Sequence, residues 1–172
     1  MKNLANKITV FRIILVPVFV VLAYLNHRYT AAVLFAVACI SDAIDGYIAR
    51  KYDQITAFGK FMDPLADKIL VLSAMCFFID RGIMPWWAVA VVLLREFIVS
   101  GLRLVAIEKN VVIAAGWSGK IKTASTMVAI MLMMVFPNRI HNIAGTAVIL
   151  VTTVYSGIEY IVLNRKVFNE EI

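Results

Sequence analysis

The chain has 172 residues, about the length of one domain, and 62% of them are hydrophobic, with a mean hydropathy of +0.87. Soluble domains hold roughly 45–50% apolar residues, so we expect an integral membrane protein with one domain covering residues 1–172. The net charge is +6. The basic residues of the chain are scattered between apolar segments instead of forming one basic face, which argues against a nucleic-acid partner.

Six apolar segments follow one another along the chain, each near the ~20 residues that a helix needs to cross a bilayer. The sequence therefore predicts an all-α, polytopic membrane protein with six transmembrane helices. The second segment turns acidic after Ile40, and the third begins acidic before it turns apolar. The six segments lie at about 8–25, 31–50, 61–79, 83–107, 118–136 and 143–163.

Basic residues are more frequent on one side of this predicted topology. That side holds the N-terminus, the 50–60 and 107–118 loops and the C-terminus, whereas the other side has Arg28, Arg81 and Arg139, one in each loop. By the positive-inside rule the rich side is cytoplasmic. We therefore expect a multi-pass protein of the cell membrane. Residues on or near the rich side are Lys2, Lys7, Arg12, Arg50, Lys51, Lys60, Lys109, Lys120, Lys122, Arg165 and Lys166.

Four aspartates lie where the second segment ends and the third begins. Asp42 and Asp45 are three residues apart and Asp63 and Asp67 four apart, so each pair shares one face of a helix. Antiparallel neighbouring spans would bring both pairs to the same depth, where bare carboxylates repel one another. Hard oxygen ligands without sulfur or imidazole favour Mg²⁺ or Mn²⁺ as the counter-charge. Helix capping is a simpler alternative for a single acid such as Asp63, which precedes Pro64.

Small and basic residues accompany the acids. Gly46 and Ala49 continue the helix of the first acid pair and leave room for a ligand near the backbone, although close helix packing explains them equally well. Arg50 suits a diphosphate or a cytoplasmic anchor. Gly59, at the entrance of the third segment, allows either a turn or the close approach of a nucleotide.

Together these residues form the pattern D-x2-D-G-x2-A-R-x8-G-x3-D-x3-D, which resembles the signature of the CDP-alcohol phosphotransferases. The resemblance implies that family's six-helix membrane fold, usually a homodimer, with its site at the cytoplasmic face. It implies that two divalent ions are bound by the four aspartates and that Asp67 is also the general base. The residues implied to contact the CDP group are Gly46, Ala49, Arg50 and Gly59.

Three looser stretches resemble the bacterial phosphatidylglycerophosphate synthases within that family. They are NKITVFRIILVP near the N-terminus, REFIVSGLR at Arg95–Arg103 and GKIKT at Gly119–Thr123. The first places Asn6 and Thr9 at the entrance of span one, where we expect them on the CDP side of the site. The other two supply basic residues for an acceptor.

Arg95 and Arg103 are eight residues apart, so they lie on roughly one stripe of the fourth span. Arg95 is near mid-span, where an unpaired cation is costly, and a pair with Glu96 is the alternative to a site role. Lys120 and Lys122 point to different faces of a helix, so only one of them is expected to reach the pocket. We expect Arg95, Arg103 and Lys122 to bind the acceptor phosphate.

The resemblance implies transfer of the phosphatidyl group of CDP-diacylglycerol to sn-glycerol 3-phosphate, giving phosphatidylglycerophosphate and CMP. The donor motif is shared by members of the family with other acceptors, so inositol phosphate, serine and phosphatidylglycerol stay open. A divalent-cation transporter is the alternative from another class. The acids lie at one membrane face and no internal repeat is evident, which argues against alternating access.

Overall fold

The structure is a computed structural model that describes residues 4–51, 57–108 and 116–165. Its side chains are described at these positions except 4–9, 42–51, 57–64, 66, 67 and 108. The described residues form helices and no strand, which confirms the all-α prediction, and each apolar segment corresponds to one helix. The helices are α1 (Leu4–Tyr24), α2 (Arg28–Lys51), α3 (Ala57–Asp80), α4 (Trp86–Glu108), α5 (Trp117–Val135) and α6 (Arg139–Leu163).

Turn and capping residues, rather than hydropathy, set some helix ends. Helix α4 begins at Trp86 because Gly82 adopts a left-handed turn conformation, with a φ of +65°, and Pro85 directly precedes the helix. Helix α6 begins four residues before its apolar segment because Asn138 caps it. The Asn138 side chain accepts a hydrogen bond from the backbone N–H of His141 at 2.9 Å.

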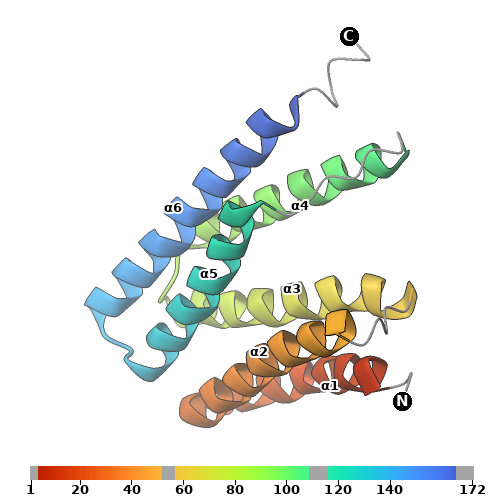
Figure 1. Cartoon of the computed structure of the whole chain (residues 1–172). Helices are drawn as coiled ribbons and strands as arrows, with labels where there is room; N and C mark the ends of the chain where they lie inside the picture. Colours follow the sequence, from red (N-terminus) through yellow and green to blue (C-terminus); the bar gives the residue numbers. More distant parts are fainter. Residues whose placement is uncertain (1–3, 52–56, 109–115, 166–172) are drawn as a thin grey trace.

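The helices form two groups of three (Figure 1). In the first group α1 packs against α2 and α3, and in the second α6 packs against α4 and α5. Contacts of α2 with α5, and of α3 with α4 and α5, join the groups. Phe19 and Phe35 pack within the first group with ring centroids 6.0 Å apart. Fully buried alanines such as Ala31, Ala38 and Ala74 let the helices approach closely.

Large apolar side chains also cover the outside of the bundle. Val33, Leu94, Phe97 and Val151 are among the exposed ones, whereas several polar side chains are buried. A soluble monomer rarely exposes a large contiguous apolar surface, so this distribution suits a lipid environment. The buried polar or charged side chains are Arg12, Lys122, Thr126, Thr146, Thr153 and Ser156.

Among the described helices, α6 alone is long and apolar enough to cross a membrane by length and composition. Helix α4 carries Arg95, Glu96 and Arg103, and α5 carries Lys120 and Lys122 near its start. These charged residues lower the apolar content of both helices. Six helices are therefore confirmed for the described part of the chain, and six membrane spans stay a prediction.

Candidate active site

The four aspartates of the signature lie inside two consecutive helices that contact each other. Asp42 and Asp45 belong to α2, and Asp63 and Asp67 belong to α3. Because α3 already begins at Ala57, Asp63 is not its N-cap, and the capping alternative for this residue is wrong. The carboxylates themselves fall outside the described side chains, so their role as metal ligands stays a prediction.

The residues predicted to contact CDP gather at one end of the first helical group. Figure 1 shows the start of α1 at the same end of the group as the end of α2 and the start of α3. All six side chains lie outside the described ones, and their contacts with CDP stay predictions. Asn6 and Thr9 are on α1, Gly46, Ala49 and Arg50 on α2, and Gly59 on α3.

A cavity of about 510 Å³ lies between the two helical groups. Five lysine or arginine side chains and one carboxylate line it, which makes it strongly cationic. It adjoins the acidic helices, because its wall includes Lys68, the residue after Asp67, and Cys39, one helical turn before Asp42. Its polar and charged lining residues include Lys68, Arg95, Glu96, Ser100, Arg103, Lys120, Lys122, Thr123, Thr126 and Tyr160.

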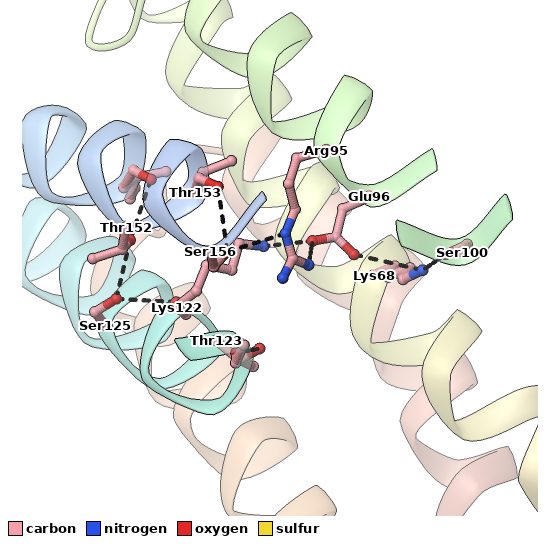
Figure 2. Close-up of polar contacts among 12 residues, drawn as sticks. Lys68, Arg95, Glu96, Ser100, Lys122, Thr123, Ser125, Thr152, Thr153 and Ser156 are labelled. Carbon is pink, nitrogen blue, oxygen red and sulfur yellow. Dashed lines mark hydrogen bonds and ion pairs between the residues drawn. The ribbon is translucent and has the colours of Figure 1, made fainter. Parts of the chain in front are cut away.

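The carboxylate of Glu96 lies between cations from three helices, as Figure 2 shows. Its Oε1 atom accepts hydrogen bonds from Lys122 Nζ at 2.7 Å and from an Arg95 guanidinium nitrogen at 2.9 Å. Its Oε2 atom is 3.5 Å from Lys68 Nζ, which also donates to Ser100 Oγ at 2.7 Å. The Lys122 and Arg95 side chains are only 7% and 12% exposed. The contacts of Glu96 with Lys122 and Arg95 are therefore largely shielded from water, and shielding strengthens charge interactions, whereas the Lys68 side chain is 38% exposed.

Both predicted arginines of α4 line the cavity, which confirms that they share one stripe. Arg95 also forms the pair with Glu96 that was the alternative to a site role, so it both lines the cavity and is paired, and its Nε donates to Ser156 Oγ at 3.1 Å. Arg103 Nε donates to the Tyr160 hydroxyl at 3.3 Å, and its guanidinium carbon is 5.8 Å from the centre of that ring. Residues of α6 therefore orient both arginines toward the cavity.

The two lysines of α5 occupy different parts of the cavity wall. Lys122 is buried, whereas Lys120 is exposed and lies over the Trp117 ring, with Nζ 4.9 Å from the ring centre. Both lysines line the cavity, so the expectation that only one reaches it is wrong. The reason is that the start of α5 contributes several of its faces to this wall.

Several residues of the cavity were not expected from the sequence, among them Lys68, Ser100 and Tyr160. Lys68 follows an aspartate of the signature, and this adjacency is the one signal that pointed to it. Ser100 lies within the REFIVSGLR stretch but has no charge to mark it. Tyr160 lies on α6, far from every motif.

Carboxylates are suited to bind divalent cations, and a cationic cavity is suited to bind phosphate esters. Acid pairs on consecutive helices next to such a cavity are therefore typical of a protein that acts on phosphate esters with divalent cations. The family model of the CDP-alcohol phosphatidyltransferases matches residues 2–157. The chain belongs to this family, as its acidic signature predicted. Members of the family use divalent metal ions and are generally bound to membranes.

Curated relatives resemble the chain over most of its length. A protein of Mycobacterium tuberculosis named probable phosphatidylglycerophosphate synthase is 40% identical over 168 residues, covering 92% of this chain and 80% of the relative. The CDP-diacylglycerol–glycerol-3-phosphate 3-phosphatidyltransferase of Bacillus subtilis is 39% identical, covering 83% and 79%. The protein of that name from Escherichia coli is 37% identical, covering 92% and 93%.

Proposed function

We propose that the chain transfers the phosphatidyl group of CDP-diacylglycerol to sn-glycerol 3-phosphate, giving phosphatidylglycerophosphate and CMP. The observation that carries this proposal is the cationic cavity beside the acidic helices. A small dianionic acceptor needs such cations, because it would otherwise be repelled by the acids. The names of the relatives describe the same reaction or its product.

The cavity also bears on the alternatives. Serine carries no phosphate and would leave the net positive charge of the cavity unbalanced, whereas a phosphorylated acceptor would supply the missing negative charge. Between glycerol 3-phosphate and inositol phosphate, the names of the relatives favour the former. A divalent-cation transporter is disfavoured, because five basic side chains would repel its cargo.

All six helices span the cell membrane in this proposal, with the active site at the cytoplasmic face. Exposed apolar side chains on the described faces of every helix support it. So do exposed tryptophans near helix ends, Trp86 and Trp87 on α4 and Trp117 on α5, since aromatic residues gather at membrane interfaces. The excess of basic residues on one side supports the cytoplasmic assignment.

The donor set of the signature fits divalent cations. Asp42, Asp45, Asp63 and Asp67 offer only carboxylate oxygens, from consecutive helices in contact, and these are the ligands that Mg²⁺ and Mn²⁺ prefer. In the proposal these residues hold two such ions. When bound, the ions supply positive charge that stabilises the diphosphate and the departing CMP.

Residues on α1, α2 and α3 bind the donor in the proposal, while its acyl chains stay in the bilayer. Small residues leave space for the nucleotide beside the helices, and Arg50 pairs with the diphosphate. The residues assigned to the CDP group are Asn6, Thr9, Gly46, Ala49, Arg50 and Gly59.

The acceptor step is a proton transfer coupled to an in-line displacement. Arg95, Arg103 and Lys122 hold the acceptor phosphate, and Arg103 is suited to a bidentate contact. The Asp67 carboxylate accepts the proton of the acceptor's primary hydroxyl group. The hydroxyl oxygen forms a bond to the β-phosphorus, and the bond between that phosphorus and the oxygen of CMP breaks.

A homodimer, each copy formed by a single domain over residues 1–172, completes the proposal. The family resemblance supports it. The molar mass of the purified protein in detergent, corrected for bound detergent, tests it, and a monomer under conditions of full activity would contradict it.

CMP release in detergent tests the proposed reaction. The purified protein is given CDP-diacylglycerol and Mg²⁺ together with glycerol 3-phosphate, inositol phosphate, serine or phosphatidylglycerol. We expect glycerol 3-phosphate to give the fastest release. A faster rate with another acceptor would move the chain elsewhere in the family, and metal flux in liposomes without CMP release would favour the transporter.

A further inference from the structure

Glu96 is the one carboxylate among the described residues that line the cavity. It contacts Lys68 of α3, Arg95 of α4 and Lys122 of α5 (Figure 2). A carboxylate at this place opposes the binding of a dianion, because it adds negative charge to a site that must attract phosphate. Its presence therefore calls for a role other than attraction of the acceptor.

Two of the three cations that Glu96 contacts, Lys68 and Arg95, also donate to hydroxyl groups. Lys68 donates to Ser100 at 2.7 Å, and Arg95 donates to Ser156 at 3.1 Å. Gly157 lies so close to the Arg95 stem that a Cβ atom there would be 3.1 Å from Arg95 Cγ. The Arg95 side chain is thus held both along its stem and at its guanidinium group. Glu96 is the residue that contacts all three cations, and these contacts connect helices from both groups of the fold.

We propose that Glu96 is a positioning residue for the acceptor step, with Ser100 as a second anchor for Lys68. Three like charges at this spacing repel one another, and the carboxylate holds them in one arrangement. An acceptor phosphate then meets cations that are already oriented, so its hydroxyl group is presented to the β-phosphorus in one geometry. This inference rests on the proposed function, because that function assigns two of these cations, Arg95 and Lys122, to the acceptor phosphate.

Replacing Glu96 by glutamine separates positioning from attraction. Glu96→Gln keeps the size of the side chain but removes the negative charge, and its amide NH₂ group faces a cation that needs an acceptor. The cavity becomes more positive, so the acceptor still binds, but the cations are no longer held in one arrangement. We expect kcat to fall about 10- to 100-fold, since a misplacement of about 1 Å can cost ~10²-fold. The KM for glycerol 3-phosphate should stay within about twofold of the wild-type value or fall, since the lost charge opposed the anion.

Three further variants serve as comparison. Glu159→Gln makes the same chemical change on α6, outside the cavity lining, where the Oε2 atom of Glu159 has no hydrogen-bond partner among the described residues. It should keep the wild-type kcat and KM. Glu96→Asp restores the charge on a shorter side chain and should recover part of kcat. Ser100→Ala leaves Glu96 intact, removes the second anchor of Lys68, and should lower kcat by a smaller factor at unchanged acceptor KM.

The experiment measures kcat and both KM values by CMP release, with thermal unfolding of each variant in detergent. A fall of kcat at unchanged or lower acceptor KM in Glu96→Gln, but not in Glu159→Gln, supports the proposal. An unchanged kcat, or an acceptor KM that rises more than kcat falls, overturns it. If Glu96→Gln does not fold, Ser100→Ala decides, and an unchanged kcat there overturns the proposal. Wild-type protein that releases no CMP with glycerol 3-phosphate overturns the proposed function, and this inference with it, before any variant is compared.

Discussion

The acidic pairs and the cationic cavity are neighbouring regions of opposite charge that arise in different ways. The four aspartates fall within 26 residues on consecutive helices, so helix periodicity alone places each pair on one face. The cations of the cavity come from α3, α4 and α5 and are more than fifty positions apart at the extremes, from Lys68 to Lys122. The acidic region is local in sequence, whereas the cavity exists only through packing of the two helical groups.

This difference corresponds to the two substrates in the proposed reaction. The acidic region serves the donor, whose diphosphate is bound together with divalent cations, and the cavity serves an acceptor that brings its own negative charge. Lys68 follows Asp67 directly in the chain, so the two regions meet at this point of α3. Loss of an acid that binds metal should therefore lower turnover, whereas loss of a cation that binds the acceptor should raise the KM for the acceptor.

The largest effect is expected from neutralising the acids that are assigned only to metal binding. Asp42→Asn, Asp45→Asn or Asp63→Asn should each lower turnover by about 1,000-fold or more, because the lost charge stabilisation is worth several kcal/mol and each ~1.4 kcal/mol is a factor of ten. CMP release with Mg²⁺ or Mn²⁺ measures it, and circular dichroism checks that the helices persist. Full wild-type turnover in excess EDTA would contradict the metal assignment.

Asp67 sharpens the comparison, because it belongs to the acidic region but is proposed to act on the acceptor. Asp67→Asn should lower kcat by about 10²–10⁴-fold, the usual contribution of a general base. Asparagine keeps the shape of the side chain but cannot accept the proton, so affinity for CDP-diacylglycerol should change far less than kcat. Turnover and donor affinity are measured on the same variant. Near-normal turnover would remove Asp67 from the role of base.

The sequence predicted the six helices of the described residues, because each helix contains an apolar segment, and their crossing of the membrane stays a prediction. The predicted starts differ by three or four residues at several helices; at α6 the start depends on the cap at Asn138, and at α4 it follows the turn at Gly82. Such ends are set by single hydrogen bonds and backbone angles, which hydropathy does not record.

Most residues of the candidate site that lie close together in the sequence were predicted, whereas most of those brought together by tertiary packing alone were not. Arg95 and Arg103 were found through the resemblance of the REFIVSGLR stretch, and their spacing of eight residues placed both on one stripe of a helix. Lys68 and Tyr160 were not found, because they reach the cavity from helices whose relative placement follows only from tertiary packing. For Glu96, the sequence suggested its pair with Arg95 but not its contacts with the two lysines.

Within the cavity, Arg103 and Lys122 should affect the acceptor more than the donor. Arg103→Ala and Lys122→Ala should each raise the KM for glycerol 3-phosphate about 10- to 100-fold, since a hydrogen bond to a charged group contributes about 1.5–3 kcal/mol. Arg103→Lys should recover only part of the loss, because lysine has no planar fork for two contacts. Substrate titrations on each variant measure both KM values. A rise in donor KM without a rise in acceptor KM would assign these residues to the CDP side or to packing.

The smallest effect on the acceptor KM is expected from replacing Lys120. This residue lies at the rim of the cavity, two positions before the buried Lys122 on the same helix. Lys120 is exposed and lies over the Trp117 ring, whereas Lys122 is buried and bonded to Glu96. An exposed charge pair contributes only about 0.2–1 kcal/mol, so Lys120→Ala should raise the acceptor KM by no more than about fivefold.

The salt dependence of the acceptor KM should separate the two lysines further. Because water and salt screen an exposed charge, the effect of Lys120→Ala on the acceptor KM should shrink at about 1 M salt, where the Debye length is about 3 Å. The effect of Lys122→Ala should persist under the same conditions, because its charge is shielded from solvent. Acceptor titrations at low and high salt on both variants measure this contrast. Equal effects with equal salt dependence would mean that burial does not distinguish the two lysines during binding of the acceptor.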